Sequence, residues 1–312
     1  MKLKKSFLLL CFLSCTLLLT NYLDLFDSCD KNQLINSSNR IINPHVYNYT
    51  LNSLVCGENK GKNLLLISLV CISPQNFDQR QLIRETWANI SLFKSIRVVF
   101  LVGLPSNKTI NDLLVLEKEK YNDIVQENFI DTYYNLTLKT IMGLKWVSEF
   151  CPMAKFTLKI DDDVVVNTPE LIKYLQTLSY TENYYMGSLQ KNARVRRNKE
   201  SKWKMTYDEY QPKCYVPYHQ GPAYILSTDM TGILFNLSQY NPLFKLEDVF
   251  MGMLISQTEA NVFQIKEKYF LDSEYSLYYA KKLNRKNNFK LFAFTQHQDF
   301  RDIWNIFYNL SL

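Results

Sequence analysis

The fold of this 312-residue chain is decided by the stretch Phe156-Thr157-Leu158-Lys159-Ile160-Asp161-Asp162-Asp163-Val164-Val165-Val166, in which three carboxylates separate two apolar runs. Apolar runs of this kind are typical of buried strands, where an uncompensated acid is costly. A divalent cation would compensate the charge, since oxygen-rich sites with few protein ligands suit Mg²⁺ or Mn²⁺ carrying a nucleotide diphosphate. The alternative is an acidic loop in solvent, the usual place for such a triplet. The flanking apolar runs favour the buried strand.

Strands alternate with helices on either side of this stretch. Residues 64–70 and 98–102 are continuous apolar runs, as in parallel strands that are covered on both faces. Polar helices are predicted at 78–89 and 111–121, and a third helix places Leu138, Ile141, Met142 and Trp146 on one face. The pattern predicts an α/β fold with a mostly parallel central sheet and flanking helices. Ligands of such sheets bind at the carboxyl ends of the strands, where the acidic triplet falls.

The N-terminus predicts a membrane anchor. Lys2, Lys4 and Lys5 precede an uncharged, largely apolar stretch that runs from Ser6 to Leu23. Its length is at the short end of what spans a bilayer, and the basic residues place the N-terminus in the cytoplasm. A cleaved signal peptide is the alternative, but no small-x-small cleavage site follows. We expect a cytoplasmic tail at 1–5, a signal anchor at 6–26, a polar stem at 27–60 and a catalytic domain at 61–312.

Sequons and cysteines are consistent with a lumenal chain. Asn-x-Ser/Thr sequons occur at Asn36, Asn48, Asn89, Asn107, Asn135, Asn236 and Asn309. Outside the predicted anchor the cysteines are Cys29, Cys56, Cys71, Cys151 and Cys214, an odd number, so at least one is free or paired between chains. Neither the Cys/His spacing nor the three histidines suggest a structural zinc site.

The net charge excludes a nucleic-acid-binding protein. The formal charge of +6 falls to +3 when Lys2, Lys4 and Lys5 are set aside, and this is too little for a nucleic-acid surface. A local basic cluster is formed by Lys191, Arg194, Arg196, Arg197, Lys199 and Lys202. It could bind an anionic group or be a solvated loop.

Six motifs in order give the chain a family resemblance. They are Arg80-Gln81-Leu82-Ile83-Arg84-Glu85-Thr86-Trp87, Phe100-Leu101-Val102-Gly103, residues 129–140, residues 159–163, Ser201-Lys202-Trp203 and Leu246-Glu247-Asp248-Val249-Phe250-Met251-Gly252. From about Leu64 to the C-terminus the chain resembles the β-1,3-galactosyltransferases of glycosyltransferase family 31. The resemblance implies the GT-A fold and an inverting, metal-dependent enzyme of the Golgi membrane, single-pass type II, with its catalytic domain in the lumen.

The resemblance also implies roles for individual residues. Asp163 and Asp161 would bind Mn²⁺ or Mg²⁺, and the UDP-sugar donor would contact Arg80, Arg84, Asp131, Lys139, Lys159, Asp161 and Asp162. Arg80 and Arg84 lie one helical turn apart, and pairing with acids is the alternative for both. Trp203 would contact the acceptor or belong to the core, whereas Trp87 is expected in the core.

Glu247 and Asp248 form the second carboxylate pair that the mechanism requires. Inversion needs a single in-line displacement, so a carboxylate must take the proton of the attacking acceptor hydroxyl. The resemblance assigns that role to Asp248 and acceptor binding or orientation to Glu247. The alternative is that both acids only begin a helix.

Departures from the family lie in the acceptor region. The family commonly carries a Tyr-Pro-Pro-Tyr/Phe-Cys-Ser-Gly segment, whereas this chain has Tyr215-Val216-Pro217-Tyr218-His219-Gln220-Gly221, with His219 in place of the cysteine. By the resemblance, the partner of Cys151 has therefore shifted to Cys214 or been lost.

The expected reaction transfers galactose from UDP-galactose to the 3-hydroxyl of a terminal GlcNAc or GalNAc on a glycoprotein or glycolipid. The alternatives are a β-1,3-N-acetylglucosaminyltransferase that uses UDP-GlcNAc and a glycan-binding pseudoenzyme. A pseudoenzyme predicts a degraded acidic triplet or a lost base, and this chain shows neither.

Overall fold

The structure is a computed structural model that describes Cys29 and residues 38–311, except 180–181, 272–274, 287–289 and 296. These residues divide into two compact units. The smaller unit contains Cys29 and Asn192–Tyr215, and the larger contains all the other described residues. The predicted catalytic region therefore includes a segment, Asn192–Tyr215, that is a compact unit of its own.

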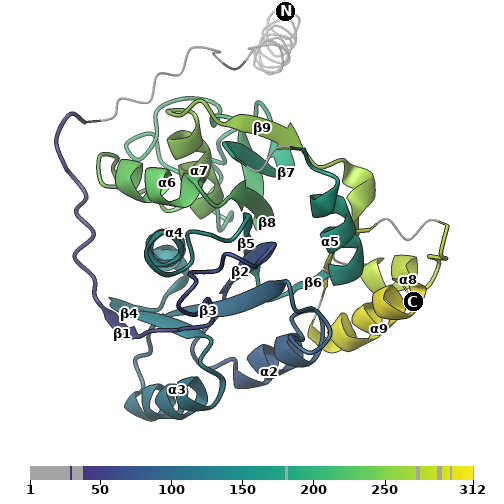
Figure 1. The fold of residues 1–312 in the computed structure, drawn as a ribbon. Coiled ribbons are helices and arrows are strands. Elements are labelled where there is room, and N and C mark those ends of the chain that lie inside the picture. The colour runs from purple at the N-terminus through teal and green to yellow at the C-terminus, as the bar shows by residue number, and fades with distance from the viewer. Residues whose placement is uncertain are drawn as a thin grey trace, which may run out of the picture. The chain divides into compact units, whose positions relative to one another are not determined.

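The larger unit is built on two sheets (Figure 1). The first has the strand order β1-β4-β3-β2-β5-β8-β7-β9, and the second the order β10-β11-β6. The strands are β1 Tyr49–Leu51, β2 Leu66–Cys71, β3 Ile96–Leu104, β4 Ile124–Ile130, β5 Phe156–Asp161, β6 Val164–Val166, β7 Tyr184–Gln190, β8 Tyr218–Ser227, β9 Asn261–Gln264, β10 Phe270–Leu271 and β11 Phe292–Phe294. The helices are α2 Phe77–Glu85, α3 Lys108–Tyr121, α4 Leu136–Phe150, α5 Thr168–Gln176, α6 Met230–Ser238, α7 Glu247–Ile255, α8 Ser276–Ala280 and α9 Phe300–Ser311, with 3-10 turns at Tyr133–Asn135, Glu267–Tyr269 and His297–Asp299.

The α/β prediction is confirmed, and the large sheet is mixed but mostly parallel, since six of its eight strands run in one direction and only β1 and β8 oppose them. Strands β4, β3, β2 and β5 run parallel, and the apolar runs predicted β2, β3 and β5 among them. Strand β8 pairs antiparallel with both β5 and β7, and β1 pairs antiparallel with β4. The sequence did not reveal β8 as the partner of the acidic strand β5, and β8 contributes to the site described below.

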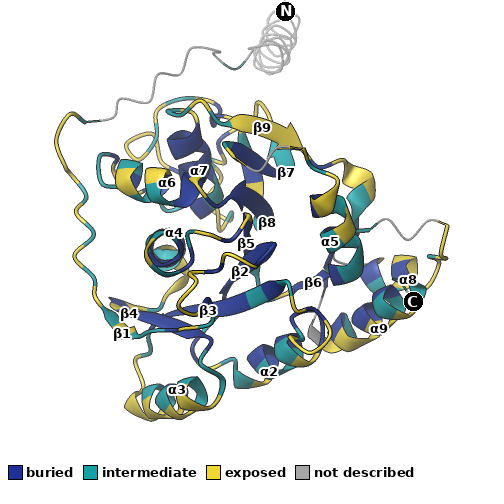
Figure 2. Cartoon of the chain, in the orientation of Figure 1, coloured by how far each residue is buried: buried dark blue, intermediate teal, exposed yellow. Residues whose placement is uncertain are grey.

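Helices cover both faces of the parallel strands (Figure 1), and β2, β3 and β5 are almost wholly buried (Figure 2). Along β2, Leu66 and Val70 pack into the core cluster that also contains residues of α2, α3, α5 and α9. Ile67 and Leu69 point to the other face and pack with α4. This alternation puts Thr157, Lys159 and Asp161 of β5 on the opposite face from Phe156, Leu158 and Ile160, which join the first cluster.

Local signals explain where the predicted helices begin and end. The side chain of Asn107 accepts a hydrogen bond from the backbone of Thr109 and so begins α3, and Asn122 ends it in the left-handed region at φ 54°. Helix α2 ends at Glu85, four residues before the predicted end, where Thr86 leaves helical geometry and donates its hydroxyl to Leu82. Trp87 is buried in the core, as expected.

The structure corrects the stem prediction for residues 45–56. Strand β1 pairs with β4, His45 contacts the carboxylate of Glu127 at 2.7 Å, and Asn52 accepts a hydrogen bond from the indole of Trp146. This part of the predicted stem belongs to the larger unit. None of the helices in the described part of the chain has both the length and the apolar composition needed to cross a bilayer. The predicted anchor at 6–26 lies outside the described residues.

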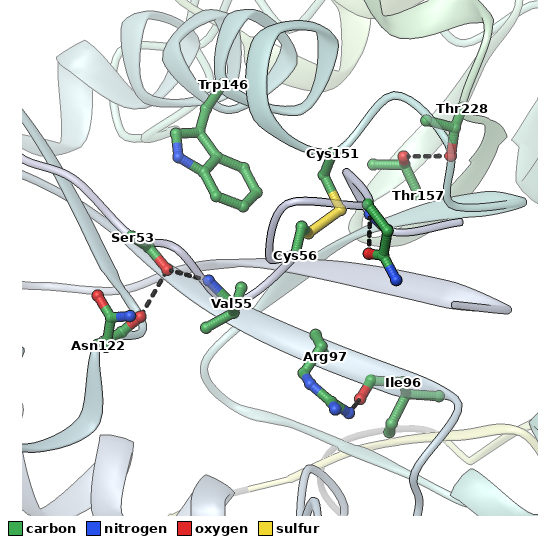
Figure 3. Close-up of a disulfide and its surroundings, with 12 residues drawn as sticks. Ser53, Val55, Cys56, Ile96, Arg97, Asn122, Trp146, Cys151, Thr157 and Thr228 are labelled. Atoms are coloured by element: carbon green, nitrogen blue, oxygen red, sulfur yellow. Dashed lines mark hydrogen bonds between the residues drawn. A yellow bond between two sulfur atoms is a disulfide. The ribbon is translucent and has the colours of Figure 1, made fainter. Parts of the chain in front are cut away.

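Disulfides join Cys56 to Cys151 and Cys29 to Cys214. Figure 3 shows the first of these beside Trp146 of α4. Gly61 lies against this bond at φ +83°, where an added Cβ would come within 2.8 Å of the Cys151 sulfur. The expectation that Cys151 pairs with Cys214 or has no partner is wrong, because the segment before β2 supplies Cys56. Cys71 is the free cysteine of the described residues, and it is buried.

Candidate active site

Lys159 is the centre of a buried polar cluster in the larger unit. It lies in the middle of β5, opposite Tyr224 in the antiparallel ladder with β8, so both side chains leave the sheet on one face. The Lys159 ammonium donates to the carboxylate of Asp161 at 2.7 Å and to the carbonyl oxygen of Gly221 at 2.8 Å. Burial disfavours the charged amine, but the carboxylates of Asp161 and Glu247 outweigh it and raise the pKa of Lys159 well above its usual value. The strand therefore carries a fixed positive charge in its interior.

Glu247 meets that charge from the first turn of α7. Its Oε2 lies 3.3 Å from the Lys159 ammonium, and its Oε1 accepts a 2.6 Å hydrogen bond from the Tyr224 hydroxyl. The side chain of Glu247 is 2% exposed. A buried carboxylate with one cation and one hydroxyl donor has its orientation fixed by both. Glu247 is therefore held in place by two strands.

Asp248 points from the same helical turn to a different environment. Its Oδ2 accepts from the backbone of Gly221 at 3.3 Å, and its Oδ1 from the backbone of Val249 at 2.8 Å. Burial, together with repulsion from Glu247, raises the pKa of Asp248 to about 6. A carboxylate has about four lone-pair sites, so these two contacts leave capacity to accept a further proton. Asp248 has the properties of a general base that works near neutral pH.

Gly221 links the two parts of the cluster. Its carbonyl oxygen accepts from Lys159, and its N–H donates to Asp248. Helix α7 can approach β8 this closely because residue 252 is glycine, where a Cβ would lie 2.6 Å from that of Tyr218. The position of Asp248 therefore depends on β5, because Lys159 of β5 binds the same glycine that binds Asp248.

The acidic triplet lies where β5 ends. Asp162 is held by Asn76, which donates to its carboxylate at 3.0 Å, and by Gln79, which donates to its carbonyl oxygen at 2.6 Å. The backbone oxygen of Asp163 accepts from Thr295, while its side chain is exposed. The side chain of Asp161 is 30% exposed, although one oxygen contacts Lys159.

These oxygens fit a hard divalent cation of the kind that binds through one or two carboxylates and completes its shell with phosphate oxygens and water. Among the described residues no group of three or more His, Cys, Asp or Glu side chains is arranged to hold a metal ion. A cation at the triplet would therefore depend on oxygens of its ligand as well as on Asp161 and Asp163.

Asp131 and Lys139 form a second pair at the same edge of the sheet. The Lys139 ammonium lies 2.9 Å from the Asp131 carboxylate and donates to the carbonyl oxygen of Ile72, the residue after β2. Asp131 also accepts from the backbone of Gly103 in β3. The pair therefore ties together the carboxyl ends of β2, β3 and β4, next to the strand that carries Asp161.

Arg80 and Arg84 have protein partners throughout. Arg80 is fully buried, contacts the carboxylate of Glu117 at 2.7 Å and donates to the carbonyl oxygens of Ser73 and Pro74. Arg84 pairs with Glu117 and with both oxygens of Asp123. This geometry favours the alternative of acid pairing over direct contact with a nucleotide. Arg80 instead fixes the loop after β2, from which Asn76 reaches Asp162.

Trp203 belongs to the smaller unit, and its indole ring is 43% exposed, so it is not a core residue of that unit. His219, which stands in place of the expected cysteine, is buried in β8 against the ring of Tyr185. Burial lowers the pKa of His219 to about 4, so the ring is neutral at physiological pH.

Four site residues were missed at the sequence level: Asn76, Gln79, Gly221 and Tyr224. Tyr224 becomes recognisable only when β8 is set antiparallel to β5 in the observed register. Asn76 and Gln79 act on Asp162 from the residue before α2 and from its first turn, and neither side chain is charged. A pattern of polar residues one turn apart before Arg80 was the only available hint.

Comparisons with known proteins show what the chain is similar to. A family model described as Galactosyltransferase matches residues 78–266, a range that contains the acidic triplet and the Glu247-Asp248 pair. Beta-1,3-galactosyltransferase 1 of Mus musculus and of Homo sapiens are each 36% identical over 234 residues, covering 73% of this chain and 71% of theirs. Lactosylceramide 1,3-N-acetyl-beta-D-glucosaminyltransferase of Homo sapiens is 36% identical over 205 residues, covering 62% of this chain and 54% of its own.

Solved structures with a similar arrangement include galactosyltransferase LgtC in complex with donor and acceptor sugar analogs. It is 10% identical with a TM-score of 0.42, covering 78% of this chain and 95% of that chain. A glycosyltransferase involved in the glycosylation of the major capsid of PBCV-1 is 12% identical with a TM-score of 0.41, covering 78% and 98%.

Proposed function

Since the chain belongs to the galactosyltransferase family and is a hexosyltransferase, we propose that it transfers galactose from UDP-galactose to the 3-hydroxyl of a terminal GlcNAc or GalNAc on a glycoprotein or glycolipid. The proposal includes inversion at the anomeric carbon and a GT-A type of catalytic domain. One observation carries the proposal. Lys159 contacts both Glu247 and Asp161 of the acidic triplet, and Asp248, the neighbour of Glu247, binds the backbone N–H of Gly221.

Asp248 is the general base of this reaction. It takes the proton of the acceptor hydroxyl, whose oxygen forms the new bond to the anomeric carbon as the bond from that carbon to the β-phosphate oxygen of UDP breaks. A pKa of about 6 keeps the carboxylate ionised at neutral pH and still makes it a stronger base than an ordinary aspartate. Two backbone N–H groups hold its orientation before the acceptor arrives.

Glu247 and Lys159 position the base. The ion pair and the Tyr224 hydroxyl fix Glu247, whose negative charge raises the pKa of its neighbour. Lys159 also fixes Gly221, whose N–H binds Asp248. In this mechanism Glu247 orients the acceptor sugar. Lys159 is a positioning residue that contacts both Glu247 and Asp161.

Asp161 and Asp163 are the residues that would hold Mn²⁺ or Mg²⁺ on the donor side. When bound, the cation supplies charge neutralisation for the departing diphosphate. Asp131 and Lys139, at the neighbouring strand ends, border the same edge of the sheet and are proposed to line the nucleotide site.

A second candidate reaction is transfer of GlcNAc from UDP-GlcNAc in the same linkage. It is favoured by the 36% identity to lactosylceramide 1,3-N-acetyl-beta-D-glucosaminyltransferase, which equals the identity to the galactosyltransferase relatives. The Leu246-Glu247-Asp248-Val249 motif resembles the galactosyl branch more closely, since the other branch often has Asp-Asp-Val. The motif supports galactose as the first choice.

The proposal also places the chain in the Golgi membrane with its catalytic region in the lumen. Residues 6–26 would be the signal anchor. Four sequon asparagines among the described residues, Asn48, Asn107, Asn236 and Asn309, are exposed and could accept a glycan.

The test is a donor panel. The purified chain is incubated with UDP-galactose, UDP-GlcNAc, UDP-GalNAc or UDP-glucose, with Mn²⁺ or EDTA, and with β-linked GlcNAc and GalNAc acceptors. Transfer and UDP release are measured separately. Galactose transfer that requires Mn²⁺ supports the proposal, and GlcNAc transfer alone would select the second candidate. Neither transfer nor UDP release with any donor would point to a glycan-binding protein that has kept the fold.

A further inference from the structure

Most of the excess of basic over acidic residues in the chain lies in residues 192–215 of the smaller unit. Residues 192–215 contain seven Lys or Arg side chains and three Asp or Glu side chains, a surplus of four, against a surplus of six in the whole sequence. Lys2, Lys4 and Lys5 account for three more, so all the remaining residues together carry one net negative charge. A surplus confined to 24 residues produces a local positive potential, unlike charge spread over a surface.

An exposed tryptophan lies between two of these cations. The Lys202 ammonium lies 4.6 Å from the centroid of the Trp203 ring system, and the Arg196 guanidinium lies 5.4 Å from it. Lys202 and Arg196 are both exposed, and Trp203 is 43% exposed. Both cations lie over the indole ring as cation–π contacts, so the exposed part of Trp203 and the two cationic groups form one surface that is both apolar and positive.

The backbone that carries these side chains is held by contacts within the same unit. Arg197 donates to the carbonyl oxygens of Met205, Thr206, Tyr210 and Pro212 and stacks on Tyr207 at 4.1 Å. Val195 and Lys213 pair through their backbones, as do Tyr215 and Ala193, and Cys29 is bonded to Cys214. Because Arg197 is used for this internal support, Arg196, Lys202 and Trp203 are presented on an ordered base, and little order has to be gained on binding.

We propose that Arg196, Lys202 and Trp203 form a binding site for an acidic saccharide, a glycan that carries sulfate or carboxylate groups. The C–H face of a pyranose ring packs on an exposed indole, and the guanidinium and ammonium groups bind the anionic substituents through charge-assisted hydrogen bonds. A neutral sugar would use only the ring, and a simple anion would use only the cations. The combination selects a ligand that has both. This inference concerns binding by the smaller unit and does not depend on the transfer reaction proposed above.

The test measures binding of a fluorescent sulfated tetrasaccharide from heparin to the purified full chain, with lactose as the neutral comparison. The double variant Arg196→Ala/Lys202→Ala and the variant Trp203→Ala should each weaken binding about tenfold, since each removes one of the two contributions. The double variant should also show a weaker dependence on salt, because salt screens exposed charges. Trp203→Phe should bind with intermediate affinity.

The matched control removes the same charge elsewhere. Lys94→Ala/Lys108→Ala takes away two exposed lysines of the larger unit and should leave tetrasaccharide binding unchanged. Equal weakening in this control would overturn the site, as would unchanged binding in both test variants. A loss that follows the cations while Trp203→Ala binds normally refutes a saccharide surface. Binding to phosphatidylserine vesicles without binding to the tetrasaccharide would assign the patch to membranes instead.

Discussion

Replacing Asp248 by asparagine separates the chemistry of the site from its architecture. Asparagine keeps the size of the side chain and one acceptor oxygen, which can retain the 2.8 Å bond from Val249. Its NH₂ group cannot accept from Gly221, but that contact is long, at 3.3 Å. Burial and repulsion from Glu247 already disfavour the ionised aspartate, so loss of its charge removes a cost from the folded state above pH 4. We expect the variant to fold with nearly unchanged stability.

The effect on turnover should be large. A lost general base costs roughly 10² to 10⁴ in rate, equivalent to about 3–5 kcal/mol of activation free energy. Donor binding should survive, because Asp161, Asp163, Asp131 and Lys139 are untouched. The assay is single-turnover transfer with saturating donor, paired with calorimetric titration of UDP in the presence of Mn²⁺. The expected outcome is a collapse of kcat with a Kd for UDP within about twofold of the unaltered chain.

The pH profile gives an independent check. The base must be deprotonated, so the rate should be low below pH 6, rise through the pKa of about 6 and level off above pH 7. Glu247→Gln removes the neighbouring charge that helps to raise this pKa and should move the rising limb to lower pH. The reasoning is refuted if Asp248→Asn transfers at a near-normal rate, or if it loses UDP binding. A dead Glu247→Gln beside an active Asp248→Asn would assign the base to Glu247.

Three further variants test the architecture of the site. Lys159→Met leaves Glu247 buried without its cation and should lower the free energy of unfolding by about 3–5 kcal/mol in urea titration. The control Lys173→Met breaks an exposed pair with Glu170 and should change the free energy of unfolding by less than about 0.5 kcal/mol. Equal effects of the two substitutions would contradict the role of burial. Tyr224→Phe removes the 2.6 Å hydrogen bond to Glu247 and should lower the free energy of unfolding by about 1–3 kcal/mol in the same titration. It should reduce kcat less than Asp248→Asn does. A variant as stable as the parent would show that the hydroxyl is dispensable. Cys56→Ser breaks the disulfide to Cys151 and should lower the free energy of unfolding by about 2–5 kcal/mol under oxidising conditions. Cys71→Ser, which alters a free cysteine, should not show this loss. A reductant should remove the difference in stability between the parent and Cys56→Ser.

The sequence predicted β2, β3 and β5 because each lies in an apolar run, but it did not predict β4, in which Gln126, Glu127 and Asn128 interrupt the apolar residues. β2 and β3 appear within two residues of the predicted ranges at most boundaries, and α3 and α4 follow their caps and apolar faces. Strands β7 and β8 were not predicted either, because Tyr184–Gln190 and Tyr218–Ser227 mix tyrosine, glycine and polar residues and so lack a periodic signal. β1 was missed for a similar reason. It is three residues long and lies in a polar segment, and its stability comes from pairing with β4 and from the nearby bond between Cys56 and Cys151.

The same distinction applies to the site. The acids could be found from sequence because consecutive carboxylates after an apolar strand have few other uses. Lys159 was also predicted as a site residue, but Tyr224 and Gly221 were not, because they become its neighbours only through the register of β5 and β8. For Arg80 and Arg84 the sequence left two alternatives open, contact with the nucleotide and pairing with acids. In the structure both pair with Glu117 of α3, and Arg84 also pairs with Asp123, the second residue after α3.

Under the proposed mechanism, the adjacency of Glu247 and Asp248 allows one short motif to serve two functions. Consecutive residues of a helix point about 100° apart, so the two carboxylates of α7 reach different surroundings. Glu247 enters a site with a lysine and a tyrosine hydroxyl, where its charge is compensated. Asp248 has only backbone N–H groups and lies beside that charge, so its affinity for a proton increases. A base of raised pKa next to a carboxylate that supplies the repulsion is a known way for a protein to divide roles between two identical chemical groups. In this chain the division depends on Lys159. If Lys159 were absent, the two acids would compete for one proton, and the distinction between the orienting residue and the base would be lost.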